Sequence, residues 1–345
     1  MKLFIKFSFI LIILLKTGNV LSDDDIFNVN NIELNKEFTK NNEKLANEAF
    51  KKGFEKLIDR LLLEKDYQKI LNTNLEQIKE LISFYQITKN NNKNKDKILV
   101  NVSFDKENIH KFFYKQNILY SDILNTEVIL FPLLIINKQQ YIYSENYFIE
   151  NWKNNNSEEL IQYTFPLESI ENIQIIEKYK NDIFKLSLTE FFKEYNIENK
   201  VFAAIERDNK KAKVFLNTEI AEKKIKKTLI ISNTSSSNKD FDNKIILEIK
   251  NTIKELIKSE NLIDVRTPSF LNVKIKLKNE KNLIKMSNRL KKIDLVSNFY
   301  VHELSKDYAL VKIRYFGQIT KIIRKLKDQN IDLKKKDGEW MLNII

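Results

Sequence analysis

Few residues of the types that carry catalysis or metal binding occur in this chain. The sequence contains two histidines, His110 and His302, and no cysteine. It therefore offers no thiolate nucleophile, no disulfide and no cysteine-ligated metal centre. His302 and Glu303 are followed by Leu-Ser-Lys, which departs from the His-Glu-x-x-His pattern of zinc proteases. We predict that both histidines are solvated surface residues.

Carboxylates and glycines add little chemistry to this picture. Asp23, Asp24 and Asp25 would attract a cation, but no glycine-containing calcium loop follows them. Glu158 and Glu159 form a pair of the kind used in acid–base catalysis, yet such pairs arise by chance among 47 acidic residues. The four glycines are scattered, whereas phosphate-binding loops need several close together. These patterns favour a protein without enzymatic activity, metal or cofactor.

The first 22 residues have the organisation of a secretory signal peptide. Lys2 and Lys6 precede an apolar stretch that is too short to span a bilayer. Val20 and Ser22 suit the cleavage site, so we predict cleavage near Ser22, with an uncleaved anchor or a buried strand as the alternatives. Abundant Lys, Ile and Asn indicate an AT-rich bacterial genome. We therefore expect a periplasmic protein that is not integral to the membrane after cleavage.

Positive charge is concentrated at one end of the mature chain. Residues 266–345 contain 19 Lys or Arg and eight Asp or Glu residues, a net charge of +11, while residues 23–265 have a net charge of −2. Such asymmetry indicates an anionic partner. Lysine predominates over the bidentate arginine fork that suits phosphate and base recognition. Lysine usage and predicted export together argue against nucleic acid and favour lipid headgroups, cell wall or an acidic protein face.

Two tryptophans and two lysine-rich stretches are the candidates for an interaction surface. Trp340 is expected to pack on the C-terminal sheet, whereas Trp152 with its polar neighbours is less obviously a core residue and is a candidate for a partner or ligand surface, although core packing stays the favoured interpretation. Residues 321–327 and 334–336 form lysine-rich helix faces that could contact an anion, although a solvated surface is the favoured interpretation. The candidate residues are Trp152, Lys321, Arg324, Lys325, Lys334, Lys335 and Lys336.

Hydrophobic periodicity predicts three small α/β (α+β) domains that position these residues. Residues 23–118 form an N-terminal α/β domain, with a long helix over 42–63 and a last helix capped by Asp105. Residues 119–265 form a central α/β domain. Its apolar run 127–136 is typical of a strand buried on both faces, and a helix is predicted over 182–195.

The basic C-terminal domain, residues 266–345, has the clearest order of elements. A strand, a helix, two strands, a second helix and closing strands follow one another, with a boundary near the Thr-Pro at 267–268. The order βαββαβ is that of a ferredoxin-like domain. This fold carries many unrelated functions and therefore implies none of them.

Four stretches resemble an exported proteobacterial family known only as domain of unknown function 2066. They are the helix 46–61, the strand 98–105, the run 128–134 with Asn151-Trp152, and Tyr315-Phe-Gly317 with Asp337-Gly-Glu-Trp340. The run 128–134 also resembles the start of periplasmic modules of the TolB N-terminal type, which bind envelope partners. The resemblance implies an envelope protein without known activity and supplies no catalytic residue.

Taken together, the sequence favours a non-enzymatic accessory or adaptor protein of the bacterial envelope. We expect the first two domains to dock onto an envelope protein and the basic domain to meet an anionic surface. A small-ligand or cell-wall binding protein with a cleft near Trp152 is the alternative, and a hydrolase with an unfamiliar site is a third hypothesis.

Overall fold

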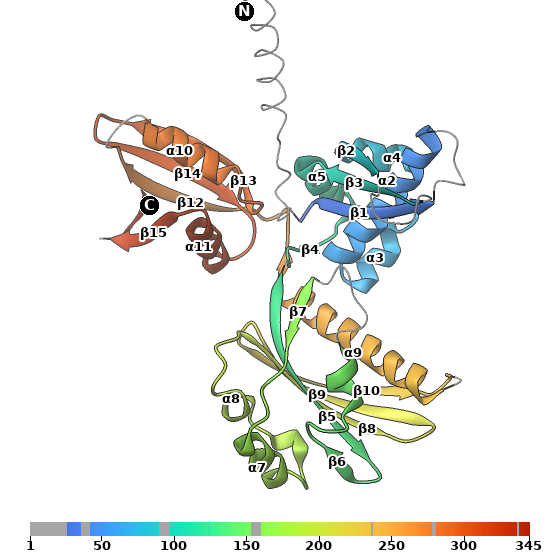
Figure 1. Cartoon of the computed structure of the whole chain (residues 1–345). Coiled ribbons are helices and arrows are strands. Elements are labelled where there is room, and N and C mark those ends of the chain that lie inside the picture. The colour runs from blue at the N-terminus through green and yellow to red at the C-terminus, as the bar shows by residue number, and fades with distance from the viewer. Residues whose placement is uncertain are drawn as a thin grey trace, which may run out of the picture.

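The computed structural model of the chain describes residues 26–35, 42–89, 97–123, 125–152, 160–235, 237–277, 281–336 and 338–345. The predicted signal peptide, Asp23–Asp25 and the pair Glu158–Glu159 lie outside these residues. The fold is mixed α/β with separate sheets, so the predicted fold class is confirmed. Figure 1 shows an N-terminal and a C-terminal unit side by side, with a central unit below them.

The N-terminal unit is a three-stranded antiparallel sheet, in the order β1-β3-β2, covered by helices. The long helix is one of these because apolar residues recur on one of its faces and pack onto the sheet. Gly53 allows the close approach, since a Cβ atom there would lie 3.1 Å from Ile32 Cδ1. The elements are β1 (Asn28–Asn35), α2 (Asn42–Leu61), α3 (Glu64–Ile70), α4 (Leu75–Glu80), β2 (Ile82–Lys89), β3 (Lys97–Phe104) and α5 (Lys106–Gln116).

Helix α5 begins where the sequence predicts it. The carboxylate of Asp105 accepts a hydrogen bond of 2.8 Å from the backbone N–H of Asn108, which confirms the predicted cap. The predicted helix 42–63 is shorter than expected, because α2 ends at Leu61 and the separate helix α3 follows.

The central unit is a sheet in the order β10-β9-β8-β5-β6, with helices on both faces. Strand β5 is buried on both faces as predicted: Val128 and Leu130 contribute to the cluster under α9, and Ile129 and Phe131 to the cluster on the opposite face. The elements are β5 (Thr126–Ile136), β6 (Gln139–Tyr141), α6 (Tyr147–Asn151), β7 (Ile161–Thr164), α7 (Ile170–Lys178), η3 (Ile183–Lys185), α8 (Leu188–Phe191), β8 (Asn199–Arg207), β9 (Lys211–Ile220), β10 (Lys223–Ser232) and α9 (Asn238–Glu260).

The predicted helix over 182–195 is wrong. The chain forms only the short turns η3 and α8 there, because Leu186 between them adopts an extended conformation with ψ of 127°. Ser187 then starts α8 by accepting a hydrogen bond of 3.4 Å from the backbone N–H of Glu190.

A short pair of strands forms a neck between the central unit and the other two units. β4 (Tyr120–Ser121) pairs antiparallel with β11 (Leu262–Ile263), so the chain enters and leaves the central unit side by side. In Figure 1 this pair lies directly above the central sheet.

The C-terminal unit has the expected order of helices and strands, with a different final strand. Its sheet order is β13-β14-β12-β16-β15, and β16 runs parallel to β12 between that strand and β15. A ferredoxin-like sheet would place the strand after the second helix directly beside the first strand. The elements are β12 (Ser269–Lys276), α10 (Lys281–Leu290), β13 (Val296–Leu304), β14 (Tyr308–Tyr315), α11 (Ile319–Asp328), β15 (Ile331–Lys336) and β16 (Glu339–Ile344).

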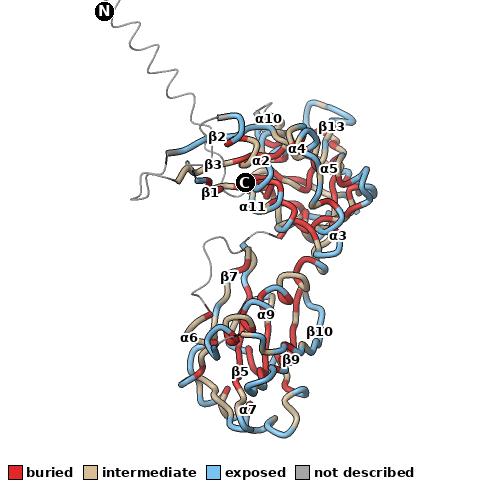
Figure 2. The backbone as a smooth tube through the Cα atoms, turned by 90° about the vertical axis from the view of Figure 1, so that its right-hand side faces the viewer, coloured by how far each residue is buried: buried red, intermediate tan, exposed pale blue. Residues whose placement is uncertain are grey.

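The N-terminal and C-terminal units share one hydrophobic cluster. Its buried members come from residues 26–120 and from residues 263–342, whereas the central unit has separate clusters on the two faces of its sheet. Figure 2 shows buried residues in red throughout the upper pair of units and again in the central unit. The first and last thirds of the chain therefore pack together around the neck.

Candidate functional site

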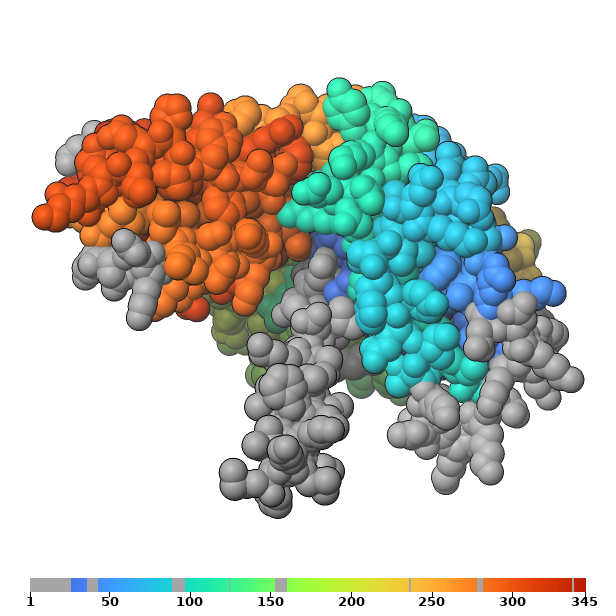
Figure 3. Space-filling model, turned by 90° about the horizontal axis from the view of Figure 1, so that it is seen from above, coloured from blue at the N-terminus to red at the C-terminus, as the bar shows by residue number. Residues whose placement is uncertain are grey.

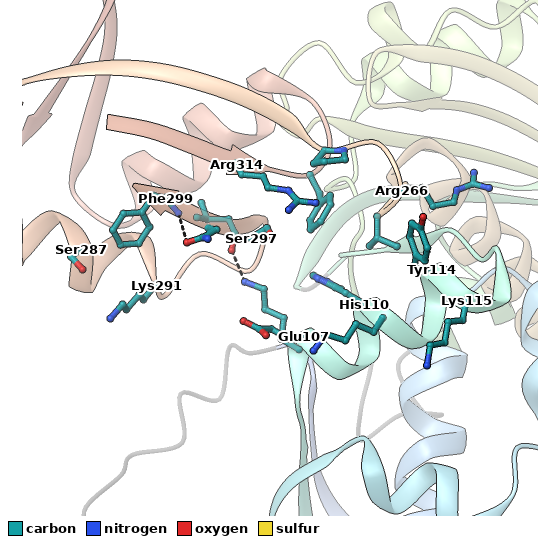
Figure 4. A pocket seen from close by; sticks show the side chains of 17 residues that line it. Glu107, His110, Tyr114, Lys115, Arg266, Ser287, Lys291, Ser297, Phe299 and Arg314 are labelled. Atoms are coloured by element: carbon teal, nitrogen blue, oxygen red, sulfur yellow. Dashed lines mark hydrogen bonds between the residues drawn. The ribbon is translucent and has the colours of Figure 1, made fainter. Parts of the chain in front are cut away.

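A basic cleft separates α5 of the N-terminal unit from the C-terminal unit. Its volume is about 1260 Å³, and its walls are α5, the segment after β11, the end of α10 and the adjoining ends of β13 and β14. From above, α5 lies against the C-terminal unit (Figure 3), and Figure 4 shows the lining side chains. Besides Glu107, the charged side chains of the lining are cationic: Lys106, Lys111, Lys115, Arg266, Lys291 and Arg314.

Helix geometry explains how α5 presents its part of the lining. Glu107, Lys111 and Lys115 follow at four-residue intervals and therefore lie along one face of the helix. Ile109 and Phe113 lie on another face and are buried in the cluster shared with the C-terminal unit. Packing of the apolar face thus fixes the cationic face toward the cleft.

Two of the cleft's cations are occupied by protein acceptors. The ammonium group of Lys106 donates hydrogen bonds to the carbonyls of Ile293 at 3.3 Å and Val296 at 2.8 Å, so it joins the two units. The guanidinium group of Arg266 donates to both carboxylate oxygens of Asp264, at 2.7 and 2.6 Å. These two residues shape the cleft and hold its walls in place.

Arg314 differs from them because its guanidinium group has no acceptor in the part of the chain that the structure describes. Strict alternation along β14 points Arg314 away from the buried face, and Figure 4 shows its side chain extending toward the α5 side of the cleft. Its Nε is buried and makes no hydrogen bond with the described residues. The guanidinium group therefore adds a positive charge to the cleft wall that has no hydrogen-bond acceptor among the described residues.

Lys111 and Lys291 add further charge to the cleft. Both side chains are exposed, and neither forms an ion pair with any part of the chain that the structure describes. Excess positive charge inside a concave surface focuses the electrostatic field and attracts anions. The cleft therefore suits a phosphate or carboxylate group better than a neutral ligand.

The prediction that His110 is a solvated surface residue is wrong. His110 is 9% exposed, its Nε2 lies 3.1 Å from the hydroxyl of Tyr120, and its ring contacts Phe27 and Phe316 edge-on. Burial, assisted by the nearby charge of Lys106, lowers the pKa of His110 to about 3. The imidazole is therefore neutral at pH 7 and serves packing between the two units. His302 is exposed on β13, as predicted.

The assignment of Trp152 to a partner surface is also wrong. Trp152 is 1% exposed and belongs to the central cluster, with Tyr163 and Phe165 against the edges of its ring system. The ammonium group of Lys250 donates a hydrogen bond of 2.9 Å to the carbonyl of Trp152. The cleft described above lies between the N-terminal and C-terminal units and not beside Trp152. The predicted ligand site near Trp152 therefore stays a prediction. Trp340 packs half-buried against the shared cluster, as predicted.

The predicted basic surface residues do not gather in one place. Lys321 forms an ion pair with the buried carboxylate of Asp122 at the neck, and Arg324 lies 3.3 Å from Glu198 of the central unit. Lys325 is partly exposed on α11. None of the predicted residues lines the cleft.

Residues 334–336 lie on the edge strand β15 and not on a helix, which corrects the predicted helix face. Lys334 pairs with Asp332 at 2.8 Å, and Lys335 and Lys336 are exposed. Lysines on an edge strand protect it from pairing with other chains. This role accounts for the three lysines without an anionic ligand.

The described residues contain no group of three or more acidic or histidine side chains placed to hold a metal ion. A helix with the length and apolarity needed to cross a membrane is likewise absent from the described part. No family model, curated protein or solved structure matches the chain. The resemblance to domain of unknown function 2066 and to TolB-type modules therefore stays a prediction.

Proposed function

We propose that the chain is a non-enzymatic adaptor that binds an anionic group of its partner in the cleft between α5 and the C-terminal unit. The surplus of cations over the single carboxylate in the cleft lining carries this proposal, and Arg314 is one of the cations without an acceptor among the described residues. Guanidinium groups form short, charge-assisted hydrogen bonds with carboxylate and phosphate oxygens. Lys111 and Lys291 stand on the opposite walls of the same cleft and would neutralise the remaining charge of the ligand.

Binding is favoured over catalysis by the chemistry of the lining. A pKa of about 3 makes the buried imidazole of His110 a weak base, and its Nε2 is already within 3.1 Å of the Tyr120 hydroxyl. The remaining charged groups are mostly cations, which bind anions and do not accept protons at neutral pH. We place the partner in the bacterial envelope because the sequence predicts a signal peptide.

Titration of the purified full chain with citrate and with inorganic phosphate tests the proposal. We compare two variants that each remove three positive charges, one from the cleft and one from the edge strand β15. The cleft variant carries Lys111→Gln, Lys291→Gln and Arg314→Gln. The matched control carries Lys334→Gln, Lys335→Gln and Lys336→Gln on β15.

The cleft variant should bind the preferred anion at least about tenfold more weakly in isothermal titration calorimetry. The control should stay within about twofold, because those lysines lie outside the cleft. Equal losses in both variants would show that only net charge matters. Failure of the unmodified chain to bind either anion would overturn the proposal.

A further inference from the structure

One face of the C-terminal sheet is not covered by any helix or strand of the described residues. Helices α10 and α11 both lie on the other face (Figure 1), where the alternate residues of β12 and β14 are buried. The residues between them point outward and remain partly or fully exposed. We call this the open face and define it by the aromatic and cationic residues Phe270, Lys274, Tyr300, Tyr308, Lys312 and Arg314.

The open face is continuous with the basic cleft. Arg314 lines the cleft and pairs in register with Phe270 of the neighbouring strand β12. Phe270 and Lys312 in turn line a second hollow of about 630 Å³ on the open face. Arg314 of the first hollow and Phe270 of the second are thus register partners on neighbouring strands, so a ligand that occupied both hollows would cross this pair.

Aromatic rings and ammonium groups alternate along this track. Phe270 is 52% exposed and Tyr300 is 42% exposed, so both rings are accessible to a ligand. The Nζ of Lys312 lies 4.7 Å from the centre of the Phe270 ring, and that of Lys274 lies 4.7 Å from the centre of the Tyr308 ring. A ligand that covers the Phe270 ring therefore meets the cation of Lys312 beside it, whereas Lys274 also pairs with Glu339 at 3.5 Å.

From this arrangement we infer that the open face binds an anionic glycan strand, with sugar rings on Phe270 and Tyr300 and carboxylates on Lys312 and Arg314. The inference rests on the proposed function, because it extends the ligand of the cleft onto the sheet. Phe270 and Tyr300 flank β14 one pleat apart, which sets their Cα atoms about 12 Å apart. That separation is comparable to the repeat of a disaccharide.

The chemistry of the open face favours a glycan over other polyanions. An acidic peptide without aromatic residues presents charge but no sugar rings that could pack on Phe270 and Tyr300. Single-stranded nucleic acid would use the same rings, but lysines outnumber the single arginine, and point charges suit scattered carboxylates. The predicted signal peptide also directs the chain to the compartment where wall and surface glycans occur.

Four probes separate these ligand classes on the purified full chain. Polygalacturonate supplies sugar rings with carboxylates, poly-L-glutamate supplies carboxylates alone, oligo(dT) supplies phosphates with bases, and citrate reports on the cleft. The test variant carries Phe270→Ser and Tyr300→Ser. Its matched control carries Phe84→Ser and Tyr85→Ser on β2, where the side chains are 52% and 43% exposed.

Polygalacturonate should bind at least about tenfold more tightly than poly-L-glutamate of equal charge. The Phe270/Tyr300 variant should lose about that factor for polygalacturonate and retain citrate binding, while the Phe84/Tyr85 control should match the unmodified chain. Arg314→Gln should weaken both ligands.

Equal binding of polygalacturonate and poly-L-glutamate, with citrate still bound, would overturn the glycan inference and leave the cleft proposal standing. Tighter binding of oligo(dT) than of polygalacturonate would also overturn it, in favour of nucleic acid. If neither citrate nor any polymer bound, the proposed function itself would fail.

Discussion

The neck region and the cleft both bring positive charges between units, but the cleft leaves some of its cations without an acceptor among the described residues. Lys258 of α9 is 1% exposed and donates hydrogen bonds of 2.6 Å to the carbonyls of Asp59 and Leu62. Lys321 of α11 pairs with Asp122. In the cleft, by contrast, the buried Nε of Arg314 finds no acceptor among the described residues.

This difference separates structural cations from candidate ligand-binding cations. Burial lowers the pKa of Lys258, and its hydrogen bonds to backbone carbonyls offset part of the cost of burying the charge. Arg314 receives no such compensation from the described chain, so a ligand has most to add there. Stability measurements on paired variants can test the distinction directly.

The largest expected effect is at Lys258. Lys258→Met should reduce the free energy of unfolding by about 3 kcal/mol, because two buried carbonyls lose their donor. Lys254→Met is the control, since its ammonium group pairs with the exposed carboxylate of Asp59 at 3.1 Å and should cost less than about 1 kcal/mol. Equilibrium urea unfolding measures both, and equal losses would remove the distinction between the two lysines.

The second-largest effect is the loss of stability in acid, which we attribute to the imidazole of His110 at the cleft wall. The folded pKa of His110 is lowered to about 3, so the unfolded chain takes up a proton near pH 6.5 that the folded chain does not. Stability should therefore fall as the pH decreases, by about 2 kcal/mol between pH 7 and pH 5.

His110→Phe, which keeps a ring against Phe27 and Phe316, should flatten this part of the pH dependence in urea unfolding. His302→Phe should leave it unchanged, because His302 is exposed. A slope that persists in His110→Phe would assign the acid sensitivity to other groups.

A smaller loss is expected at the neck ion pair. Lys321→Ala should destabilise the fold by about 1 kcal/mol, because the buried carboxylate of Asp122 loses its cation. Lys327→Ala, at an exposed position of the same helix, should change stability by less than about 0.5 kcal/mol. Thermal unfolding of the two variants is sufficient for the comparison, and matching melting temperatures would argue against a structural role for Lys321.

The smallest change in stability is expected at Arg314. Arg314→Gln should alter the free energy of unfolding by less than about 0.5 kcal/mol while weakening anion binding, since the guanidinium group has no described acceptor to lose. Urea unfolding alongside calorimetric titration gives both quantities. A loss above about 1.5 kcal/mol would make Arg314 a structural residue like Lys258.

Local patterns in the sequence were sufficient to predict most of the fold. The apolar run of β5, the Asp105 cap and the alternation of β12 and β14 each depend on neighbouring residues, and the structure contains all three. The predicted 182–195 helix is wrong because Leu186 and Ser187 leave the helical conformation and α8 ends at Phe191. The position of β16 depends on pairing with β12, which no local pattern records.

Local sequence patterns could not predict the cleft, because its walls come from residues that are far apart in the chain. The hydrogen bond from Lys106 to Val296 joins residues 190 positions apart. Trp152 was misassigned because its polar sequence neighbours concealed its packing against Tyr163 and Phe165. Two signals were present all the same: the four-residue spacing of Lys111 and Lys115, and the outward register of Arg314.

The hydrophobic cluster shared by the N-terminal and C-terminal units determines the order in which the units can complete their packing during synthesis. Its members lie in residues 26–120 and 263–342, so it cannot close until nearly the whole chain has been made. The central unit holds its own clusters within residues 123–257 and can complete them before residues 263–342 have been made. The N-terminal unit is thus translated first, but part of its packing has to wait for the C-terminal unit.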